Sequence, residues 1–258
     1  MTFLPLLGLK DKRSQILHFA WKNVKIRYRD SYLGLLWTAL EPLLYFVFLY
    51  VVFTNIKIGV KEDFGIYLIT GIVLYHTFVK GTQGGLGSLK ENIGILSSIN
   101  LRREFFPVVS TVTSSIMLLV EVGVLFAIMP VFGFTPGWTI ILLIPILLLL
   151  QILILGFSYL LSITVVYVKD IQPLWSVFVH ALIFVTPIFW YVEDMGGIAL
   201  EIQKINPLGQ LIEMAHKVVF GELPSFNEWA YSTAVIFAIL FVGYGIFQKF
   251  QKGVVERI

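Results

Sequence analysis

Long apolar stretches are the feature that most constrains how this chain folds. A membrane span needs about 20 mainly apolar residues to cross a hydrocarbon core of about 30 Å. The sequence predicts six such spans, at 33–53, 66–82, 107–132, 138–168, 173–191 and 228–247. Only 14% of the 258 residues are charged, too few for the surface of a soluble domain of this length. We therefore expect an all-α integral membrane domain over residues 33–258.

The positions of the basic residues predict which ends face the cytoplasm. Cytoplasmic connections of membrane proteins carry an excess of Lys and Arg. Fifteen of the 19 Lys and Arg residues lie before the first span, in the second and fourth connections or after the last span, if Lys80 near the end of the second span is counted with the second connection; four lie in the remaining connections. This distribution predicts that both termini are cytoplasmic. It also accounts for the net charge of +3 without a nucleic-acid partner.

The segment 1–32 is expected to be a cytoplasmic amphipathic segment at the membrane interface. Between residues 10 and 29, apolar residues recur at helical spacing among basic ones. We expect a helix there, with its apolar face in the acyl boundary and its cations at anionic headgroups. The alternative is a plain basic flank of the first span. The apolar positions are Ile16, Leu17, Phe19, Ala20, Val24 and Tyr28.

The connection 192–227 is too long for a simple turn. Two semi-apolar stretches flank Asn206-Pro207, and proline removes a backbone donor and disfavours helix at the residue before it. We expect two short re-entrant helices before the last span, broken at this dipeptide. An ordinary extracellular loop is the alternative.

Motifs for bond-making chemistry are absent from the sequence. It has no cysteine and no GxxxxGK[ST], HExxH or GxSxG motif. The run from Gly81 to Gly87 lacks the lysine that would reach a phosphate, and we expect it to be a flexible end of the second span. We expect a chain that is not an enzyme and binds no cofactor or metal.

Four ionisable residues fall within the predicted spans: Glu41, His76, Glu121 and His180. Such residues mark substrate paths or proton relays in many membrane proteins. A proton-coupled carrier usually concentrates them, whereas here they are scattered one per helix. We expect interhelical hydrogen bonds or water-facing positions, and the sequence leaves their individual roles open.

Aromatic residues form one stripe on each of two predicted spans. A face that combines Trp, Tyr and Glu is unusual for contact with lipid tails, and aromatic rings suit the apolar C–H faces of sugars. A surface for a sliding glycan is therefore one interpretation, and helix packing or lipid contact is the other. The stripes are Trp37, Glu41, Tyr45, Phe48 and Val52 on the first span, and Trp175, Phe178, Leu182, Val185 and Phe189 on the fifth.

Residues 21–47, WKNVKIRYRDSYLGLLWTALEPLLYFV, resemble the permease subunits of polysaccharide ABC exporters in the type-2 ABC family. That family opens with a basic amphipathic segment, a form of K-x-R-Y-x-x-S-x-L-G-x-L-W and a proline. The matching residues are Lys25, Arg27, Tyr28, Ser31, Leu33, Gly34, Leu36, Trp37 and Pro42. Glu41 departs from the pattern, because a glutamine is commoner there.

Two further stretches resemble the same family. NIGILSSINLRREFFPVVS, 92–110, is similar to its cytoplasmic second connection, with Arg103, Phe106 and Pro107 at the matching positions. INPLGQLIEMAHKVVFGELP, 205–224, resembles its outer segment before the last span.

The resemblance implies a function and a set of partners. The chain would be a permease that pairs with a second copy of itself and with a separate ATPase, which would bind ATP and Mg²⁺. It would export a lipid-linked polysaccharide, O-antigen or teichoic acid, across the bacterial inner membrane and would contact membrane lipids. A type-2 ABC permease for a lipid or drug, or a non-transporting scaffold of glycan assembly, are the alternatives.

The aromatic stripes predict the first of three groups of site residues, and the resemblance implies the other two. The substrate channel would include Trp37, Glu41, Tyr45, Phe48, Trp175, Phe178 and Phe189. A coupling helix of this chain, in its second cytoplasmic connection, would dock in a groove of the ATPase and involve Leu96, Arg102, Arg103, Glu104, Phe105 and Phe106. An outer gate would involve Asn206, Pro207 and Leu208.

Overall fold

The computed structural model describes residues 12–29, 31–56, 61–94, 102–194 and 196–254. Within these ranges the chain is helical and contains no strand. Short 3₁₀ turns extend or join several of the helices. The helices are α1 (Lys12–Arg27), α2 (Leu36–Ile56), α3 (Phe64–Gly87), α5 (Phe105–Ile128), α6 (Leu143–Tyr167), α7 (Ile171–Leu182), α8 (Gly197–Ile205), α9 (Pro207–Val219) and α10 (Phe226–Phe250).

Five helical segments in the described part are long and apolar enough to cross a membrane. They are Leu36–Ile56, Phe64–Gly87, Phe105–Phe132, Trp138–Tyr167 and Phe226–Gly253. The expected all-α membrane fold is therefore confirmed, with five long spans where the sequence predicts six. The expected fifth span, 173–191, is instead a shorter apolar helix over Ile171–Val185.

The early end of this helix follows from Pro187. Thr186, directly before the proline, has an extended backbone with φ −106° and ψ 139°. A proline clashes with a helical residue before it, so the helix cannot continue through Thr186. At about 1.5 Å per residue the helix is about 22 Å long, shorter than the hydrocarbon core.

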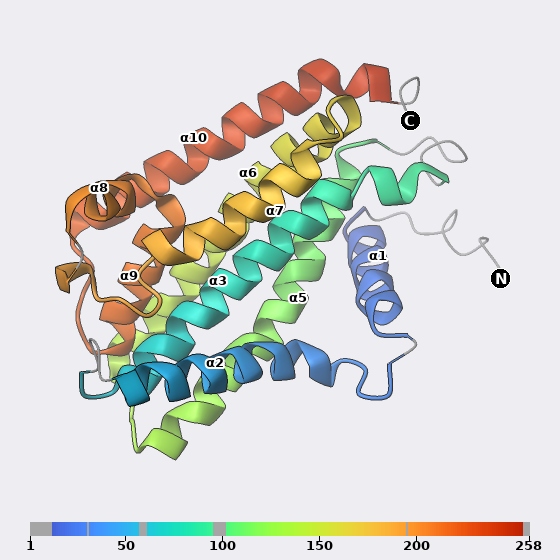
Figure 1. The fold of residues 1–258 in the computed structure, drawn as a ribbon. Helices are drawn as coiled ribbons and strands as arrows, with labels where there is room; N and C mark the ends of the chain where they lie inside the picture. Colours follow the sequence, from blue (N-terminus) through green and yellow to red (C-terminus); the bar gives the residue numbers. More distant parts are fainter. Residues whose placement is uncertain (1–11, 30, 57–60, 95–101, 195, 255–258) are drawn as a thin grey trace.

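Helix α3 lies at the centre of the fold (Figure 1), in contact with α2, α5, α6 and α9. Every residue from Phe64 to Leu74 is buried. By contrast, α2 buries only Thr38, Pro42 and Phe46, and α7 only Val179. Figure 1 shows α2 and α7 on either side of α3, so two sparsely packed helices flank a fully packed one.

The glycine run at the end of α3 is helical, contrary to the expected flexible end after Thr82. Helix α3 continues to Gly87 because its glycines let α6 approach closely. A Cβ atom added at Gly85 would lie 2.0 Å from Ser158 Oγ and 2.8 Å from Ser158 Cα. A side chain at this position would push α3 and α6 apart.

We expect Gly85→Ala to destabilise the protein by about 1–3 kcal/mol, the usual cost of overpacking a well-packed core. Thermal unfolding of the purified chain in detergent measures this loss. Gly123→Ala on α5 is the matched control, because a Cβ atom there meets nothing within 4 Å. Equal melting temperatures for the two variants would contradict the close approach of α3 and α6.

Helix α1 confirms the predicted N-terminal helix over residues 12–27, and residues 1–11 lie outside the described part. Its packing differs from the expectation. Phe19, Ala20 and Val24 are buried, and Phe19 makes an edge contact with Phe105 of α5 at 5.2 Å between ring centroids. The face expected in the acyl boundary therefore packs largely on protein, while Leu17 and Trp21 remain exposed.

The predicted break at Asn206-Pro207 is present. Helix α8 ends at Ile205 and α9 begins at Pro207, with Asn206 extended at φ −77° and ψ 107°. Helix α9 packs against α3, α6 and α10 and is largely buried. In Figure 1, α8 and α9 lie on the left, whereas α1 and the C-terminal ends of α3 and α10 lie on the right.

Candidate functional site

A cleft of about 160 Å³ lies between α2 and α7 and is floored by α3. Tyr45 contributes from α2, and Val179 and His180 contribute from α7. The Tyr75 hydroxyl on α3 donates a hydrogen bond to the Val179 carbonyl. The fold thus brings together the two helices that carry the predicted aromatic stripes. The other lining residues are Ile72, His76, Val79, Ile183 and Ile188.

The aromatic residues of the predicted α2 stripe lie on the exposed face of the helix, whereas Phe46 is buried. Trp37, Tyr45 and Phe48 expose 36%, 54% and 67% of their surface. On α7, Phe178 is half exposed, and the Trp175 ring lies 5.3 Å from it. These rings give each helix an aromatic surface that the described part of the chain leaves exposed. On α7, Phe178 lines a hollow shared with α6 and α8 and does not line the cleft to α2.

Phe189 does not share this surface, although the sequence places it on the same stripe. The stripe assumes a continuous helix, and the helix ends at Val185. Phe189 is 5% exposed and stacks on Phe53 at 5.1 Å between ring centroids. Trp175 is also partly engaged, since its Nε1 donates to Thr82 Oγ1 at 3.2 Å. Phe189 therefore serves packing between α2 and the segment after α7.

A cluster of charged side chains joins α2, α3 and α5 beside the cleft. His76 Nδ1 lies 2.9 Å from Glu121 Oε1, and His76 Nε2 lies 3.4 Å from Glu41 Oε2. Thr77 donates to Glu121 Oε2 at 2.7 Å, and Lys80 forms an ion pair with Glu41. Glu121 is almost fully buried. The expectation of interhelical hydrogen bonds is confirmed for Glu121 and His76, whereas Glu41 takes part through ion-pair contacts with His76 and Lys80.

His180, the fourth ionisable residue noted within the predicted spans, has no part in the cluster. It is exposed, which agrees with the water-facing alternative, and its Nδ1 donates to the Ser176 carbonyl of its own helix at 2.5 Å. Lys80 belongs to the cluster, although the sequence predicts no role for it beyond that of a basic residue near the cytoplasmic end of the second span. The available signal was its spacing of four residues from His76, which places both side chains on one helix face.

The start of α5 is tied to the end of α10. Arg103 Nη1 donates to the Gln251 carbonyl, and Gln248 Nε2 donates to Glu104 Oε1. Arg102 is exposed, and Leu96 lies outside the described residues. Arg103 and Glu104 of the expected coupling set therefore already hydrogen-bond to other residues of this chain.

The two aromatic residues of the expected coupling set pack against other helices of this chain and are not exposed for contact with a partner. Phe106 is 3% exposed and belongs to a buried cluster with Tyr159 and Phe247. Phe105 contacts both Phe106 and Phe19. These rings therefore hold α5 against its neighbours, and Phe106 has no surface to offer a partner.

The expected gate residues form a buried joint between α7 and α9. Asn206 Oδ1 accepts from the Leu208 backbone N–H at 3.1 Å, which caps α9. Its Nδ2 donates to Thr186 Oγ1, also at 3.1 Å. Asn206 and Leu208 are buried, and Pro207 occupies the first helical position. The joint fixes α9 relative to the end of α7.

An exposed ion pair connects the α2–α3 connection to the segment before α8. Lys61 Nζ lies 2.8 Å from Glu193 Oε2. This hydrogen bond raises the pKa of Lys61 and lowers the pKa of Glu193, because each charge stabilises the other. Lys61 also lies 4.2 Å from the centroid of the Tyr191 ring.

Comparison with known proteins identifies the family. The ABC-2 type transporter family matches residues 14–220. The O-antigen export system permease protein RfbA of Myxococcus xanthus is 23% identical over 256 residues, which cover 97% of both chains. A Klebsiella pneumoniae protein of the same name is 25% identical over 234 residues, 89% of both chains. Because the family match spans most of the 258 residues of this chain, the chain belongs to the ABC-2 type transporter family.

Proposed function

We propose that this chain is the permease subunit of an exporter that moves a lipid-linked, O-antigen-like polysaccharide across the bacterial inner membrane. The observation that carries the proposal is the similarity, over 97% of both chains, to a protein named as an O-antigen export permease. The five long apolar helices agree with a multi-pass membrane subunit.

A separate ABC ATPase drives the transport and binds ATP and Mg²⁺. The family match supports this partner, and the sequence has no phosphate-binding loop of its own. A second copy of the chain completes the membrane part. In support of a dimer, α2 and α7 present broad apolar faces that the described chain leaves uncovered.

The path for the glycan runs along these faces of α2 and α7. A long polymer cannot be held by a fixed hydrogen-bond site and still move. Aromatic rings tolerate sliding, because each contact contributes only about 1 kcal/mol by analogy with aromatic pairs. Trp37, Tyr45, Phe48 and Phe178 supply this surface, and Glu41 lies at its edge within the charged cluster.

The topology proposed for the exporter has both termini in the cytoplasm. Helix α7 and the non-helical residues 186–191 complete a sixth crossing, and α8 and α9 form a re-entrant pair on the outer side. Asn206, Pro207 and Leu208 lie at the joint of this pair and form the outer gate. The distribution of Lys and Arg and the placement of α8 and α9 opposite α1 support this orientation.

Reconstitution tests the proposed function. The chain is incorporated into liposomes with its partner ATPase and a lipid-linked glycan, and movement of the glycan to the far leaflet is measured with a membrane-impermeant lectin. We expect transport that requires ATP and both subunits. ATP-dependent movement of a lipid or drug without the glycan would contradict polysaccharide export, and no ATP-dependent movement at all would favour a scaffold.

Among the described residues of the coupling set, Arg102 is exposed and available to the ATPase, whereas Arg103 and Glu104 bond to the end of α10 and Phe106 is buried. We expect a photo-crosslinking residue at position 102 to capture the ATPase. The same residue at Ile198, exposed at the opposite end of the fold, is the control and is expected to capture none. Capture of lipid alone at position 102 would contradict the coupling role.

A further inference from the structure

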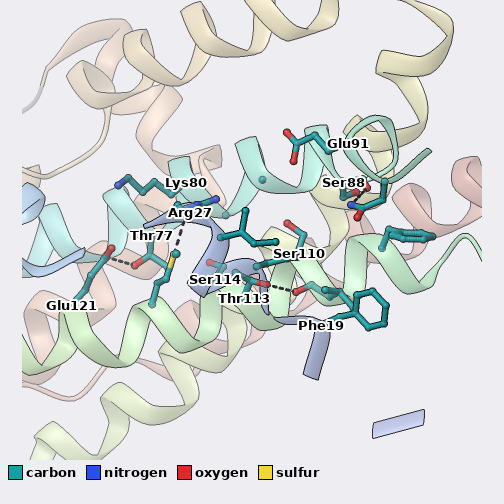
Figure 2. A pocket seen from close by; sticks show the side chains of 18 residues that line it. Phe19, Arg27, Thr77, Lys80, Ser88, Glu91, Ser110, Thr113, Ser114 and Glu121 are labelled. Carbon is teal, nitrogen blue, oxygen red and sulfur yellow. Dashed lines mark hydrogen bonds between the residues drawn. The ribbon is translucent and has the colours of Figure 1, made fainter. Parts of the chain in front are cut away.

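A polar cavity of about 420 Å³ lies between α1, α3 and α5. No residue lines both this cavity and the cleft between α2 and α7. Figure 2 shows Glu121 at one end of the cavity and Ser88 and Glu91 toward the other, with Arg27 and Lys80 between them. Two cations and several hydroxyls therefore face a space that the proposed glycan path does not use.

Arg27 provides most of the unused hydrogen-bond donors that line the cavity. It lies in the last turn of α1 and is exposed. In the described chain its guanidinium has one hydrogen bond, from Nη1 to the Met117 Sδ atom at 3.3 Å, and no carboxylate within ion-pair distance. A thioether is a weak acceptor, so most of the five donors of the guanidinium remain available. Lys80 lies close enough to repel it.

Ser88 provides an independent indication of a ligand. Its side chain is 4% exposed and lines the cavity, yet its Oγ has no hydrogen-bond partner among the described residues. Buried hydroxyls are almost always hydrogen-bonded, because burial without a partner forfeits their bonds to water. An acceptor inside the cavity would satisfy this donor.

Glycines keep the space open opposite two further hydroxyls. A Cβ atom at Gly81 would lie 2.8 Å from Ser114 Oγ, and one at Gly84 would lie 3.0 Å from Ser110 Oγ. Both serines lie on α5, four residues apart and therefore on one helix face. Side chains on α3 at these positions would fill the cavity that the glycines leave.

We propose that this cavity binds the phosphate group of a membrane lipid. A guanidinium binds phosphate oxygens through paired hydrogen bonds, and serine hydroxyls donate to the remaining oxygens. The apolar residues Leu17, Trp21 and Ile26 are exposed on α1, the helix that carries Arg27, and offer contact to acyl chains. Glu121 does not oppose the phosphate directly, since its oxygens are engaged by His76 and Thr77. Glu91, at the far end, suits an amine of the headgroup.

Ligand-dependent thermal stabilisation of the full-length chain in detergent tests the site. The probes are dioctanoyl phosphatidylglycerol, dioctanoyl phosphatidylethanolamine, phosphate-free dioctanoylglycerol and inorganic phosphate. We expect both phospholipids to stabilise the chain at lower concentration than inorganic phosphate, and dioctanoylglycerol to have no effect. Inorganic phosphate that binds as tightly as the phospholipids would overturn the lipid as the source, and equal stabilisation by dioctanoylglycerol would overturn phosphate recognition.

Matched variants locate the effect at the cavity. Arg27→Gln is expected to weaken phospholipid binding by about 10-fold or more, the usual range for loss of a charged hydrogen-bond partner. Arg27→Lys keeps the charge without the paired geometry and is expected to fall between Arg27→Gln and the unmodified chain. Lys25→Gln is the control, because Lys25 lies over Trp21 on the same helix and does not line the cavity. Equal weakening by Lys25→Gln, or unchanged binding by Arg27→Gln, would overturn the site.

Discussion

Glu121→Ala is expected to lower the stability of the protein by about 2–4 kcal/mol. The substitution leaves His76 Nδ1 without its acceptor, which costs about 1–3 kcal/mol, and the emptied volume of the buried side chain adds to the loss. Thr77 Oγ1 loses one acceptor but still donates to the Val73 carbonyl at 2.9 Å. In a chain of this size the loss corresponds to a melting temperature lower by about 5–10 °C. Thermal unfolding in detergent, followed through tryptophan fluorescence, measures it.

Two comparison variants separate the loss of these hydrogen bonds from the loss of a charge. Glu121→Gln retains an amide oxygen that accepts from Thr77, so we expect less than half the destabilisation of Glu121→Ala. Glu91→Ala removes an exposed carboxylate and is expected to leave the melting temperature unchanged. A Glu121→Ala protein that melts like the unmodified chain would show that the cluster does not hold α3 and α5 together.

The triple variant Tyr45→Ala, Phe48→Ala, Phe178→Ala is expected to reduce glycan export about 10-fold or more at limiting substrate. Three rings at about 1 kcal/mol each amount to about 3 kcal/mol of contact with the sliding polymer. Basal ATP hydrolysis and assembly with the ATPase are expected to stay unchanged, because these rings are exposed and support little of the core. Export and ATP hydrolysis measured in the same proteoliposomes separate the two effects.

The control for this variant removes equally exposed apolar side chains elsewhere. Leu119, Leu148 and Phe241 on α5, α6 and α10 are 74%, 61% and 68% exposed. Their combined replacement by alanine is expected to leave the export rate within about twofold of that of the unmodified chain. Singly exposed apolar side chains are normal on a protein surface, and these three lie outside α2 and α7. Equal loss of export in both triple variants would mean that general destabilisation, and not the path, explains the result.

Local chemistry made much of the fold predictable. The apolar runs place the five long helices within a few residues, and Asn206-Pro207 predicts the break between α8 and α9. Two helix ends were missed for identifiable reasons. The prediction of a span over 173–191 followed the apolar composition and took no account of Pro187. In the structure, this proline ends the helical segment at Val185. The glycines after Thr82 were interpreted as flexible, whereas they are interface residues between α3 and α6.

The site was less predictable, because its contacts join residues far apart in the sequence. Glu41, His76 and Glu121 were each noted as unusual within a span, but one sequence shows no reason why three separate helices should bring them together. The cavity at Arg27 was missed for the same reason. Its donors come from α1, α3 and α5, and Arg27 alone looks like one more basic residue of a cytoplasmic flank.

Site-specific photo-crosslinking during export tests most directly whether the α2 and α7 faces carry the glycan. The chain has no cysteine, so a single cysteine introduced at position 48 or 178 accepts a photoactivatable maleimide without competing sites. The label is activated while a glycan is held partway through the assembled exporter, with position 241 as the lipid-facing comparison. We expect positions 48 and 178 to capture polysaccharide and position 241 to capture lipid alone. Capture of lipid alone at all three positions would contradict the account.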